Sequence, residues 1–309
     1  MSEASVIRWL LQGDPAIRWQ VLRDFTNERD AVVAGERARV AAEGWGRALL
    51  DRQAEEGYWD PNDEGWMISM DALILLREMG LDPRSAEAIR AVSRVKANLR
   101  WEALDNRPYF DGETEACING AILAFGSYFG ERCDRIVERL LEEQLADGGW
   151  NCDAPPSTRS SFNSTIRVLE GLLEYERRWG ESTAVSHARG KAREYLLERR
   201  LLRRLSNGEI INRKWARFTF PTMWHYDVLR ALDYFRSAGA EPDPRMAEAI
   251  AIVRARRHQN GRWPMNYLHP DRLGFSLEPE TGRASRWNTL RAMRVLKWYD
   301  GRKDPAPVP

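Results

Sequence analysis

His225 is the side chain of this chain best suited to acid–base chemistry. It stands between Trp224 and Tyr226, with Asp227 two positions further along. A histidine beside a carboxylate can serve as an acid or a base near neutral pH. We therefore predict catalytic roles for His225 and Asp227. The alternative is a structural histidine whose ring nitrogens are satisfied by hydrogen bonds.

Asp71 is a further candidate for a catalytic carboxylate. It begins the segment Asp-Ala-Leu-Ile-Leu-Leu, and Asp227 begins the similar segment Asp-Val-Leu-Arg-Ala-Leu. A group that recurs at an equivalent place argues against a unique catalytic role, because equivalent acids of this kind are more often helix caps. Capping is therefore the alternative for both residues.

Composition indicates which classes of partner and which cellular compartment to expect. The 47 basic and 46 acidic residues leave a formal net charge of +1, so the charge gives no reason to expect nucleic acid or an anionic membrane as a partner. The three cysteines are widely spaced and form no CxxC pair, which is typical of a reducing compartment. No apolar stretch is long enough to span a membrane, and the first residues lack a signal-peptide pattern. We expect a soluble, cytoplasmic protein.

The elements that position these residues repeat along the chain. Residues 82–89 and 243–250 share seven of eight identities, and each stretch follows an apolar segment that ends in glycine. This pattern predicts that a helix ends at the glycine, that Asp caps the next helix, and that Pro takes its first position. Such glycines recur at intervals of about 50 to 60 residues, which indicates about five divergent repeats. They are Gly80, Gly130, Gly180, Gly239 and Gly301.

Two kinds of helix alternate in these repeats. The segments before the glycines are small and apolar around much of their circumference, whereas residues 133–144 and 246–257 are amphipathic. Inner apolar helices alternating with outer amphipathic helices predict an all-α fold, an α/α toroid of about five to six helix pairs. We expect one domain over residues 1–300, with residues 1–45 as a partial repeat and residues 301–309 as a flexible tail.

Thirteen tryptophans indicate a shared structural motif, an aromatic cavity, or both. Gln53-x3-Gly57-x-Trp59 recurs as Gln144-x3-Gly148-x-Trp150, and Arg257-x3-Gly261-x-Trp263 keeps the Gly and Trp, while Arg204-x3-Gly208-x-Ile210 is weaker. We expect the Gln to hydrogen-bond free amides at the start of a neighbouring helix, the Gly to permit a left-handed turn, and the Trp to cover the bond.

This pattern resembles the QxxxGxW (QW) repeat of squalene cyclases and related terpenoid cyclases. Over roughly residues 45 to 300 the chain is similar to the superfamily that these enzymes form with protein prenyltransferase β-subunits. It looks most like the short bacterial prenyltransferase/squalene cyclase repeat-type proteins of that superfamily. The resemblance implies an α/α toroid whose central cavity is lined by the starts of the inner helices and the loops before them.

Aromatic residues gather where the resemblance places the cavity. Their π faces can hold a polyene or stabilise a carbocation. The alternative is that they only fill the centre of the ring. Five basic residues would bind a diphosphate if they converged, namely Arg159, Arg213, Lys214, Arg217 and Arg286. The predicted cavity residues are Trp66, Tyr109, Phe162, Phe220, Trp224, Tyr226, Arg286 and Trp287.

The resemblance also suggests two kinds of chemistry. Class II terpenoid cyclases protonate their substrate with a DxDD motif, which this chain lacks. Protein prenyltransferases hold zinc with Asp-x-Cys and a later His, and here Glu115, Cys117 and His225 fall at similar places. Three ligands and an open position suit catalytic zinc, with Glu115 as a further catalytic candidate. In the alternative, Cys117 is a small buried hydrophobe and Glu115 a first-turn acid.

Three hypotheses for function follow. The first is a terpenoid cyclase-like or prenyltransferase-like protein that holds an isoprenoid or other apolar small molecule, as a lyase, isomerase or transferase with no cofactor demanded by the sequence. The second is a zinc-dependent prenyl or thiol alkyl transferase. The third is a non-catalytic toroid that binds a lipid or a protein partner.

Overall fold

The computed structural model describes residues 2–59, 65–269, 273, 274, 276–278 and 280–301. Most of the predicted flexible tail, residues 302–309, lies outside the described residues. A two-stranded antiparallel pair joins β1 (Arg100–Trp101) to β2 (Arg107–Pro108). Short 3-10 turns are η1 (Arg39–Ala41), η2 (Glu102–Leu104), η3 (Tyr109–Asp111), η4 (Arg213–Ala216) and η5 (Pro244–Met246). The α-helices are α1 (Glu3–Leu10), α2 (Pro15–Phe25), α3 (Asp30–Ala38), α4 (Gly44–Leu50), α5 (Gly65–Met79), α6 (Ala86–Asn98), α7 (Ala116–Phe129), α8 (Asp134–Glu142), α9 (Phe162–Trp179), α10 (Thr183–Glu198), α11 (Val228–Ser237), α12 (Ala247–Ala255) and α13 (Arg286–Asp300).

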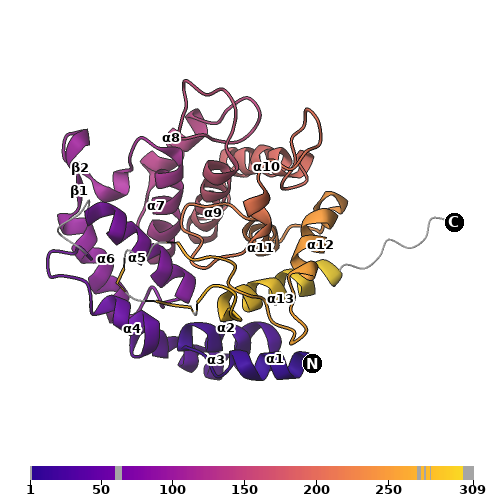
Figure 1. Cartoon of the computed structure of the whole chain (residues 1–309). Helices are drawn as coiled ribbons and strands as arrows, with labels where there is room; N and C mark the ends of the chain where they lie inside the picture. The colour runs from indigo at the N-terminus through magenta and orange to yellow at the C-terminus, as the bar shows by residue number, and fades with distance from the viewer. Residues whose placement is uncertain (1, 60–64, 270–272, 275, 279, 302–309) are drawn as a thin grey trace.

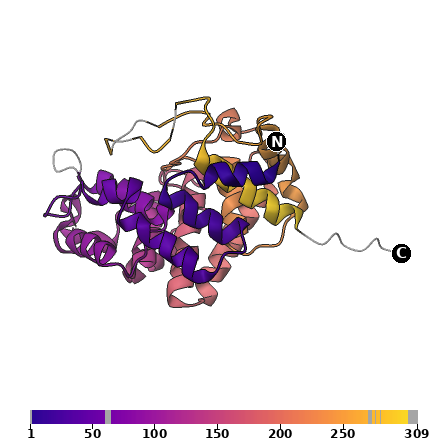
Figure 2. The same ribbon diagram turned by 90° about the horizontal axis from the view of Figure 1, so that it is seen from below.

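Within the described chain, helices α2, α5, α7, α9, α11 and α13 form a closed inner ring (Figure 1). The indole N–H of Trp19 in α2 donates to the carbonyl of Met79 in α5 at 2.8 Å. At the other seam, the Arg294 guanidinium in α13 donates to the side-chain oxygen of Gln20 in α2 at 2.8 Å, and Figure 2 shows α13 beside the N-terminal helices. The prediction of an all-α ring of inner and outer helices is confirmed.

Small residues let α7 and α9 pack closely. A β-carbon on Gly171 would lie 2.4 Å from the carbonyl oxygen of Gly120, and one on Gly120 would lie 2.7 Å from the Arg167 backbone. Only glycine fits at such a crossing, because any larger side chain would push the two helices apart. This tight contact fixes the starts of α7 and α9 side by side, where the candidate site lies.

The Gln-Gly-Trp segments make the same contacts wherever they occur. The Gln144 amide donates to Gly148 O at 2.7 Å and to Ala188 O in α10 at 2.8 Å, and Gln53 bonds Gly57 O and Ala91 O in α6 in the same way. The Trp150 indole N–H donates to Leu140 O of its own outer helix at 2.7 Å. The expectation that the Gln bonds helix-start amides is wrong, because the amide N–H donates to carbonyl groups within the next outer helix.

The capping predictions for the two similar stretches differ in outcome. Asp243 accepts a hydrogen bond from the Arg245 N–H at 2.8 Å, with Pro244 at the first position of η5, as predicted. Asp82 instead starts a turn, and Ser85 caps α6 by accepting from Ala88 N. An N-cap must precede the first helical residue, and the extra turn between Asp82 and α6 moves that place to Ser85.

The inner helices are buried along most of their length and the outer helices on one face only. The exception to an apolar interior is a set of buried arginines at the ring centre. The amphipathic α8 buries only Ile136, Val137 and Leu140, whereas α7 is buried along most of its length. The inner helices α9, α11 and α13 also bury Arg167, Arg230 and Arg291 among their apolar residues. The centre of the ring is therefore partly charged on this side.

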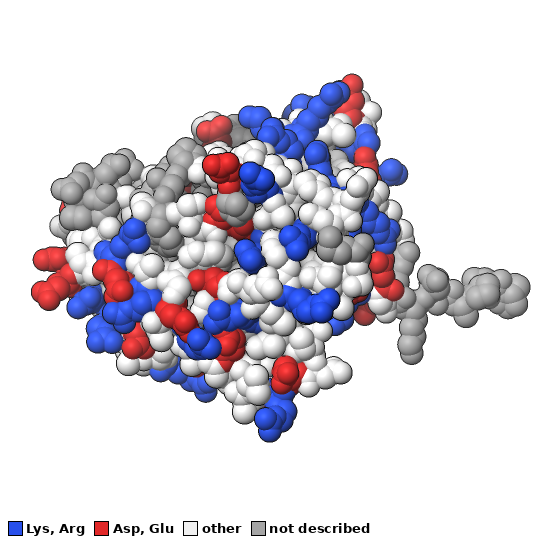
Figure 3. All heavy atoms as spheres, turned by 60° about the horizontal axis from the view of Figure 1, so that its bottom comes forward, with Lys and Arg blue, Asp and Glu red and all other residues white. Residues whose placement is uncertain are grey.

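The outer surface carries charges of both signs. Figure 3 shows Lys and Arg interspersed with Asp and Glu over one face, as expected for a near-neutral chain. Of the helices in the described ranges, none combines the length and apolarity needed to cross a membrane.

Candidate functional site

A cavity of about 680 Å³ opens at the end of the ring where the inner helices begin. Trp66 is the second residue of α5, Cys117 is the second residue of α7, and His225 lies just before α11. One part of the wall is apolar and the rest is polar. The apolar part consists of Trp66, Met67, Met70, Ile118, Met223 and Trp224, and the ionisable part of Asp71, Glu113, Glu115, Cys117, Cys152, Asp153, Arg167, His225 and His269.

Glu115, Cys117 and Cys152 form a cluster in this wall. One ligand atom from each lies within 4.8 Å of the others. The backbone N–H of Cys117 points to Cys152 Sγ at 3.2 Å, and Cys117 Sγ lies 3.5 Å from Glu115 Oε2. A side-chain hydrogen bond between the two cysteines lowers the pKa of Cys152 and raises the pKa of Cys117, and burial adds to the rise at Cys117. The cluster therefore favours one thiolate, on Cys152.

Two histidines of the cavity wall stack on each other. The rings of His225 and His269 are 3.9 Å apart and parallel to within 3°, and Trp224 stacks on His225 at 4.0 Å. Burial and the charge of Arg230 lower the pKa of His225, and burial with His225 lowers that of His269 to about 4. Both imidazoles are neutral at neutral pH, so His225 is better suited to accept a proton than to supply one.

The two predicted catalytic aspartates have different places. Asp227 caps α11 by accepting from the Arg230 N–H at 2.8 Å, it is almost fully buried, and it does not line the cavity. Burial raises the pKa of Asp227, against the lowering effect of Arg291. Asp71 lies in the second turn of α5 and lines the cavity wall, so capping does not describe its role.

The predicted aromatic residues are divided between the cavity and the core. Trp66 and Trp224 line the cavity, and Trp224 is 51% exposed at its rim. Tyr109, Phe162, Tyr226 and Trp287 are buried in aromatic clusters of the core instead. Phe220 stacks on Trp287 with ring centres 4.1 Å apart. The buried aromatic residues therefore fill the centre of the ring, which is the alternative given for them above.

The five basic residues predicted for a diphosphate do not meet in this cavity. Arg286 lies over the ring of Trp9, 4.7 Å from its centre, and Arg217 lies over Tyr267. Arg213 and Lys214 are exposed in η4, and Arg159 is exposed in the loop before α9. Within the described ranges, none of the five lines the cavity.

Sequence reasoning gave no role to three residues of the site, although the resemblance places the loop before α9, which holds Cys152, at the cavity. Cys152 stands in a loop 35 residues after Cys117, and His269 lies in the connection between α12 and α13, so no local pattern joins either to the cavity. That connection reaches across the ring, since Arg52 after α4 donates to Gly274 O at 2.9 Å. Arg167 left a signal, because a charged residue within an apolar inner helix has to face either a partner or a cavity.

Fold and cavity together define a helical-ring protein with a small-molecule-sized cavity at one end. The arrangement is similar to the solved apo structure of the type II terpene cyclase MstE from Scytonema, with a TM-score of 0.46 and 16% identity over 92% of this chain and 87% of that chain. An MstE variant bound to its product, merosterolic acid A, gives 0.45 and 16% over 92% and 86%. A variant bound to the substrate geranylgeranyl dihydroxybenzoate gives 0.42 and 14% over 91% and 85%. No protein-family model and no curated protein sequence matches the chain.

Proposed function

We propose that the protein is an enzyme that binds an isoprenoid or similar apolar small molecule in the cavity at the start of the inner helices. The observation that carries the proposal is the division of the wall, in which Trp66, Ile118 and Trp224 belong to the apolar part and Cys152 and His225 to the polar part. Apolar walls with a few polar groups are typical of small-molecule sites. Trp faces suit an unsaturated chain or a developing cation.

The likeness in arrangement to a terpene cyclase is compatible with this ligand class, but the chemistry would differ. The chain lacks the DxDD motif, and its cavity wall instead carries a neutral His225, acidic groups including Asp71 and Glu115, and the thiol pair. His225 would accept a proton from the bound molecule, and a thiolate on Cys152 would act as a nucleophile or a metal ligand.

Filling the cavity tests the proposal. Ile118 lines the cavity, so Ile118→Trp should occupy the space that the ligand needs. Ile89 is 56% exposed on α6, and Ile89→Trp is the matched control. Native mass spectrometry with farnesol should show one farnesol per chain in the wild type and in I89W, and none in I118W. Equal retention by I118W, or none by the wild type, would sink the proposal.

A second candidate function is a zinc-dependent thiol or prenyl transfer, favoured by the cluster of Glu115, Cys117 and Cys152. Two thiolates and one carboxylate are a donor set that zinc accepts, and a fourth position facing the cavity would remain for substrate. The proposed ligands therefore include Cys152 in the place predicted for His225. Zinc there would hold a thiol as its thiolate and increase its reactivity at neutral pH.

Metal analysis separates the two ligand sets. Purified wild-type protein should bind one Co²⁺ per chain, with thiolate-to-cobalt charge-transfer absorption. Cys152→Ser should abolish that absorption, while His225→Asn should leave it unchanged. A spectrum without thiolate ligation in the wild type, or its survival in C152S, would exclude this metal site.

A further inference from the structure

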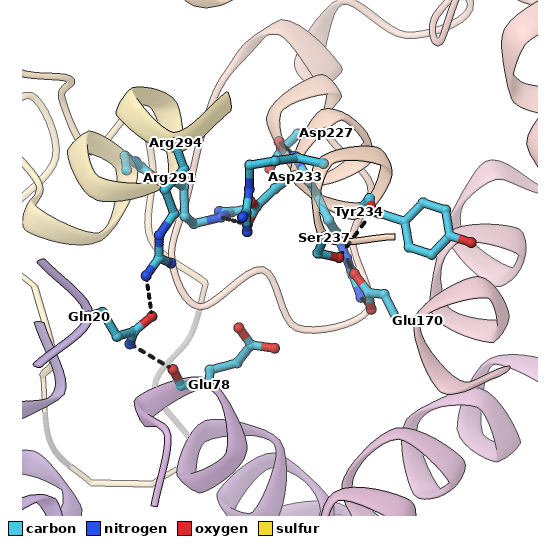
Figure 4. Close-up of polar contacts among 12 residues, drawn as sticks. Gln20, Glu78, Glu170, Asp227, Asp233, Tyr234, Ser237, Arg291 and Arg294 are labelled. Carbon is cyan, nitrogen blue, oxygen red and sulfur yellow. Dashed lines mark hydrogen bonds and ion pairs between the residues drawn. The ribbon is translucent and has the colours of Figure 1, made fainter. Parts of the chain in front are cut away.

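A second, smaller chamber lies in the centre of the ring and adjoins the cavity. Its volume is about 160 Å³, and Arg167 and Met223 line both spaces. The chamber reaches toward the later turns of the inner helices, and Figure 4 shows some of the polar side chains that line it, among them Glu170, Asp233 and Arg291. Seven guanidinium groups line it, from Arg77, Arg167, Arg177, Arg230, Arg236, Arg291 and Arg294.

The carboxylates that line the chamber already have partners. Arg230 holds both oxygens of Glu170, at 2.8 and 2.6 Å. Glu78 pairs with Arg77 at 2.7 Å. Asp233 pairs with Arg236 at 2.8 Å and with Arg291 at 3.7 Å.

Other acids neutralise more of the arginines from outside the chamber. Glu174 pairs with Arg77 at 3.0 Å and with Arg177 at 3.6 Å. Asp24 binds Arg294 across the ring seam. These pairs account for every guanidinium of the chamber except that of Arg167.

Arg167 is a buried cation without an ion-pair partner among the described residues. Its side chain donates from Nη2 to the carbonyl of Met223 at 2.6 Å, and its Nε–H has no hydrogen-bond partner. The residue is only 4% exposed. The Nε–H of Arg77, another residue of the chamber wall, is also buried and has no hydrogen-bond partner in the described part of the chain. Buried donors are nearly always satisfied, so two unsatisfied ones on residues that line one chamber favour a bound group there.

Crowding of like charges points the same way. Burial and the neighbouring Arg230 lower the pKa of Arg167 to about 10, and Glu170 and Asp71 offset this only in part. A guanidinium is costly to bury without a counter-ion. An oxyanion would supply both the missing charge and the missing acceptors, and guanidinium groups match the geometry of phosphate and carboxylate oxygens.

We propose that this central chamber binds a small phosphate-class oxyanion. The oxyanion is either free or the head group of a ligand whose tail lies in the cavity at the start of the inner helices. Arg167 is the principal donor, and Arg77 lines the same chamber as a second guanidinium with an unsatisfied Nε–H. The chamber differs in place and chemistry from the cavity at the start of the inner helices. The proposal of an oxyanion site therefore does not depend on the proposed function.

Calorimetric titration with inorganic phosphate in chloride buffer at constant ionic strength tests the proposal. The wild type should bind one phosphate per chain, and Arg167→Met should weaken binding about 10- to 100-fold, the loss expected for one charge-assisted donor. Arg84→Met is the control, because the Arg84 side chain is 87% exposed. Thermal unfolding without phosphate should show R167M no less stable than the wild type, because the substitution removes an unpaired buried charge.

The source of the oxyanion is resolved with octyl phosphate. If octyl phosphate binds at least tenfold more tightly than inorganic phosphate, and I118W removes the difference, the oxyanion is the head group of the cavity ligand. If octyl phosphate and inorganic phosphate bind with equal affinity, and I118W binds each as the wild type does, the oxyanion is free. If neither binds the wild type, or if R167M binds phosphate as the wild type does, the proposal is overturned.

Discussion

The backbone N–H of Cys117 points directly to Cys152 Sγ, 3.2 Å away, across the gap between α7 and the loop that precedes α9. Cys117 is the second residue of α7, so this N–H is one of the amides that a helix start leaves without an internal partner. A thiolate at such a place is stabilised by the hydrogen bond and by the positive end of the helix dipole. This position favours a thiolate on Cys152, in the cavity wall.

Cys152 should be the most reactive cysteine. The side-chain hydrogen bond from Cys117 lowers the pKa of Cys152, and the backbone N–H of Cys117 adds to this, whereas burial raises the pKa of Cys133 to about 12. Limited alkylation of the native protein with iodoacetamide at pH 7, followed by peptide mass spectrometry, should label Cys152 first and Cys133 last. Since the thiolate is the nucleophile, Cys117→Ala, which removes the thiol donor and keeps the backbone N–H, should slow the labelling of Cys152 at pH 7 and leave the rate at pH 9.5 unchanged. Faster labelling of Cys133 would contradict the assignment.

Glu278 should make stability fall as the pH rises. Burial raises the pKa of Glu278 to about 7, although the Ser285 hydroxyl and the Trp287 N–H donate to its carboxylate. A raised folded pKa means that the stabilising contribution is complete below about pH 4 and is lost as the pH rises through 7. Between pH 5 and 8 the loss should be on the order of 2–4 kcal/mol.

Comparison of Glu278→Gln with the wild type isolates this effect, because other carboxyl groups titrate in both proteins. The amide keeps an oxygen that can accept from Ser285 and Trp287, and it cannot ionise. Urea unfolding at pH 5, 6, 7 and 8 should show E278Q more stable than the wild type at pH 8 and similar to it at pH 5. A difference that is constant with pH would refute the role of Glu278.

Gln144 should stabilise the ring by joining neighbouring outer helices. Its amide donates to Gly148 O and Ala188 O, so Gln144→Met should leave two carbonyls without this donor and cost about 1–2 kcal/mol. The control is Gln259→Met, at an exposed position in the turn after α12. Denaturant unfolding measures the difference, and an equal effect of the two substitutions would show that the contact adds no stability.

The architecture could be predicted because its signals are local and repeated. Gly80, Gly130 and Gly180 follow helices at regular intervals, and the recurring Gln and Trp identify outer-helix ends whose side chains make matching contacts. The partners of those Gln residues were predicted less well. Sequence shows which residue can donate a hydrogen bond, but the acceptor depends on how far the next helix is shifted along its axis.

The site could be predicted only in part. Glu115 and Cys117 lie two residues apart and come together as expected, whereas Cys152 joins them because its loop returns to the start of α7. Loop paths of that kind depend on tertiary packing rather than on local pattern. His269 is brought to His225 by another such connection.

The sequence contains a signal for the charged centre of the ring, but the apolar residues around each charged residue mask it. Glu170, Arg230 and Arg291 each stand at the fourth position of an aligned inner-helix segment, among small and apolar residues. The average apolarity of those segments predicts burial correctly, and the three residues are largely buried. A charge at a repeated buried position indicates a polar interior, because an isolated ion there would be too costly.

Photolabelling with a diazirine-bearing farnesol analogue tests most directly whether the cavity at the start of the inner helices binds the ligand. Peptide mass spectrometry should place the label within residues 65–71, 115–118 or 223–226, and unlabelled farnesol should compete with it. The label should be lost in I118W and kept in I89W. Labelling confined to the outer helices α6 and α10, or unaffected by I118W, would contradict the account.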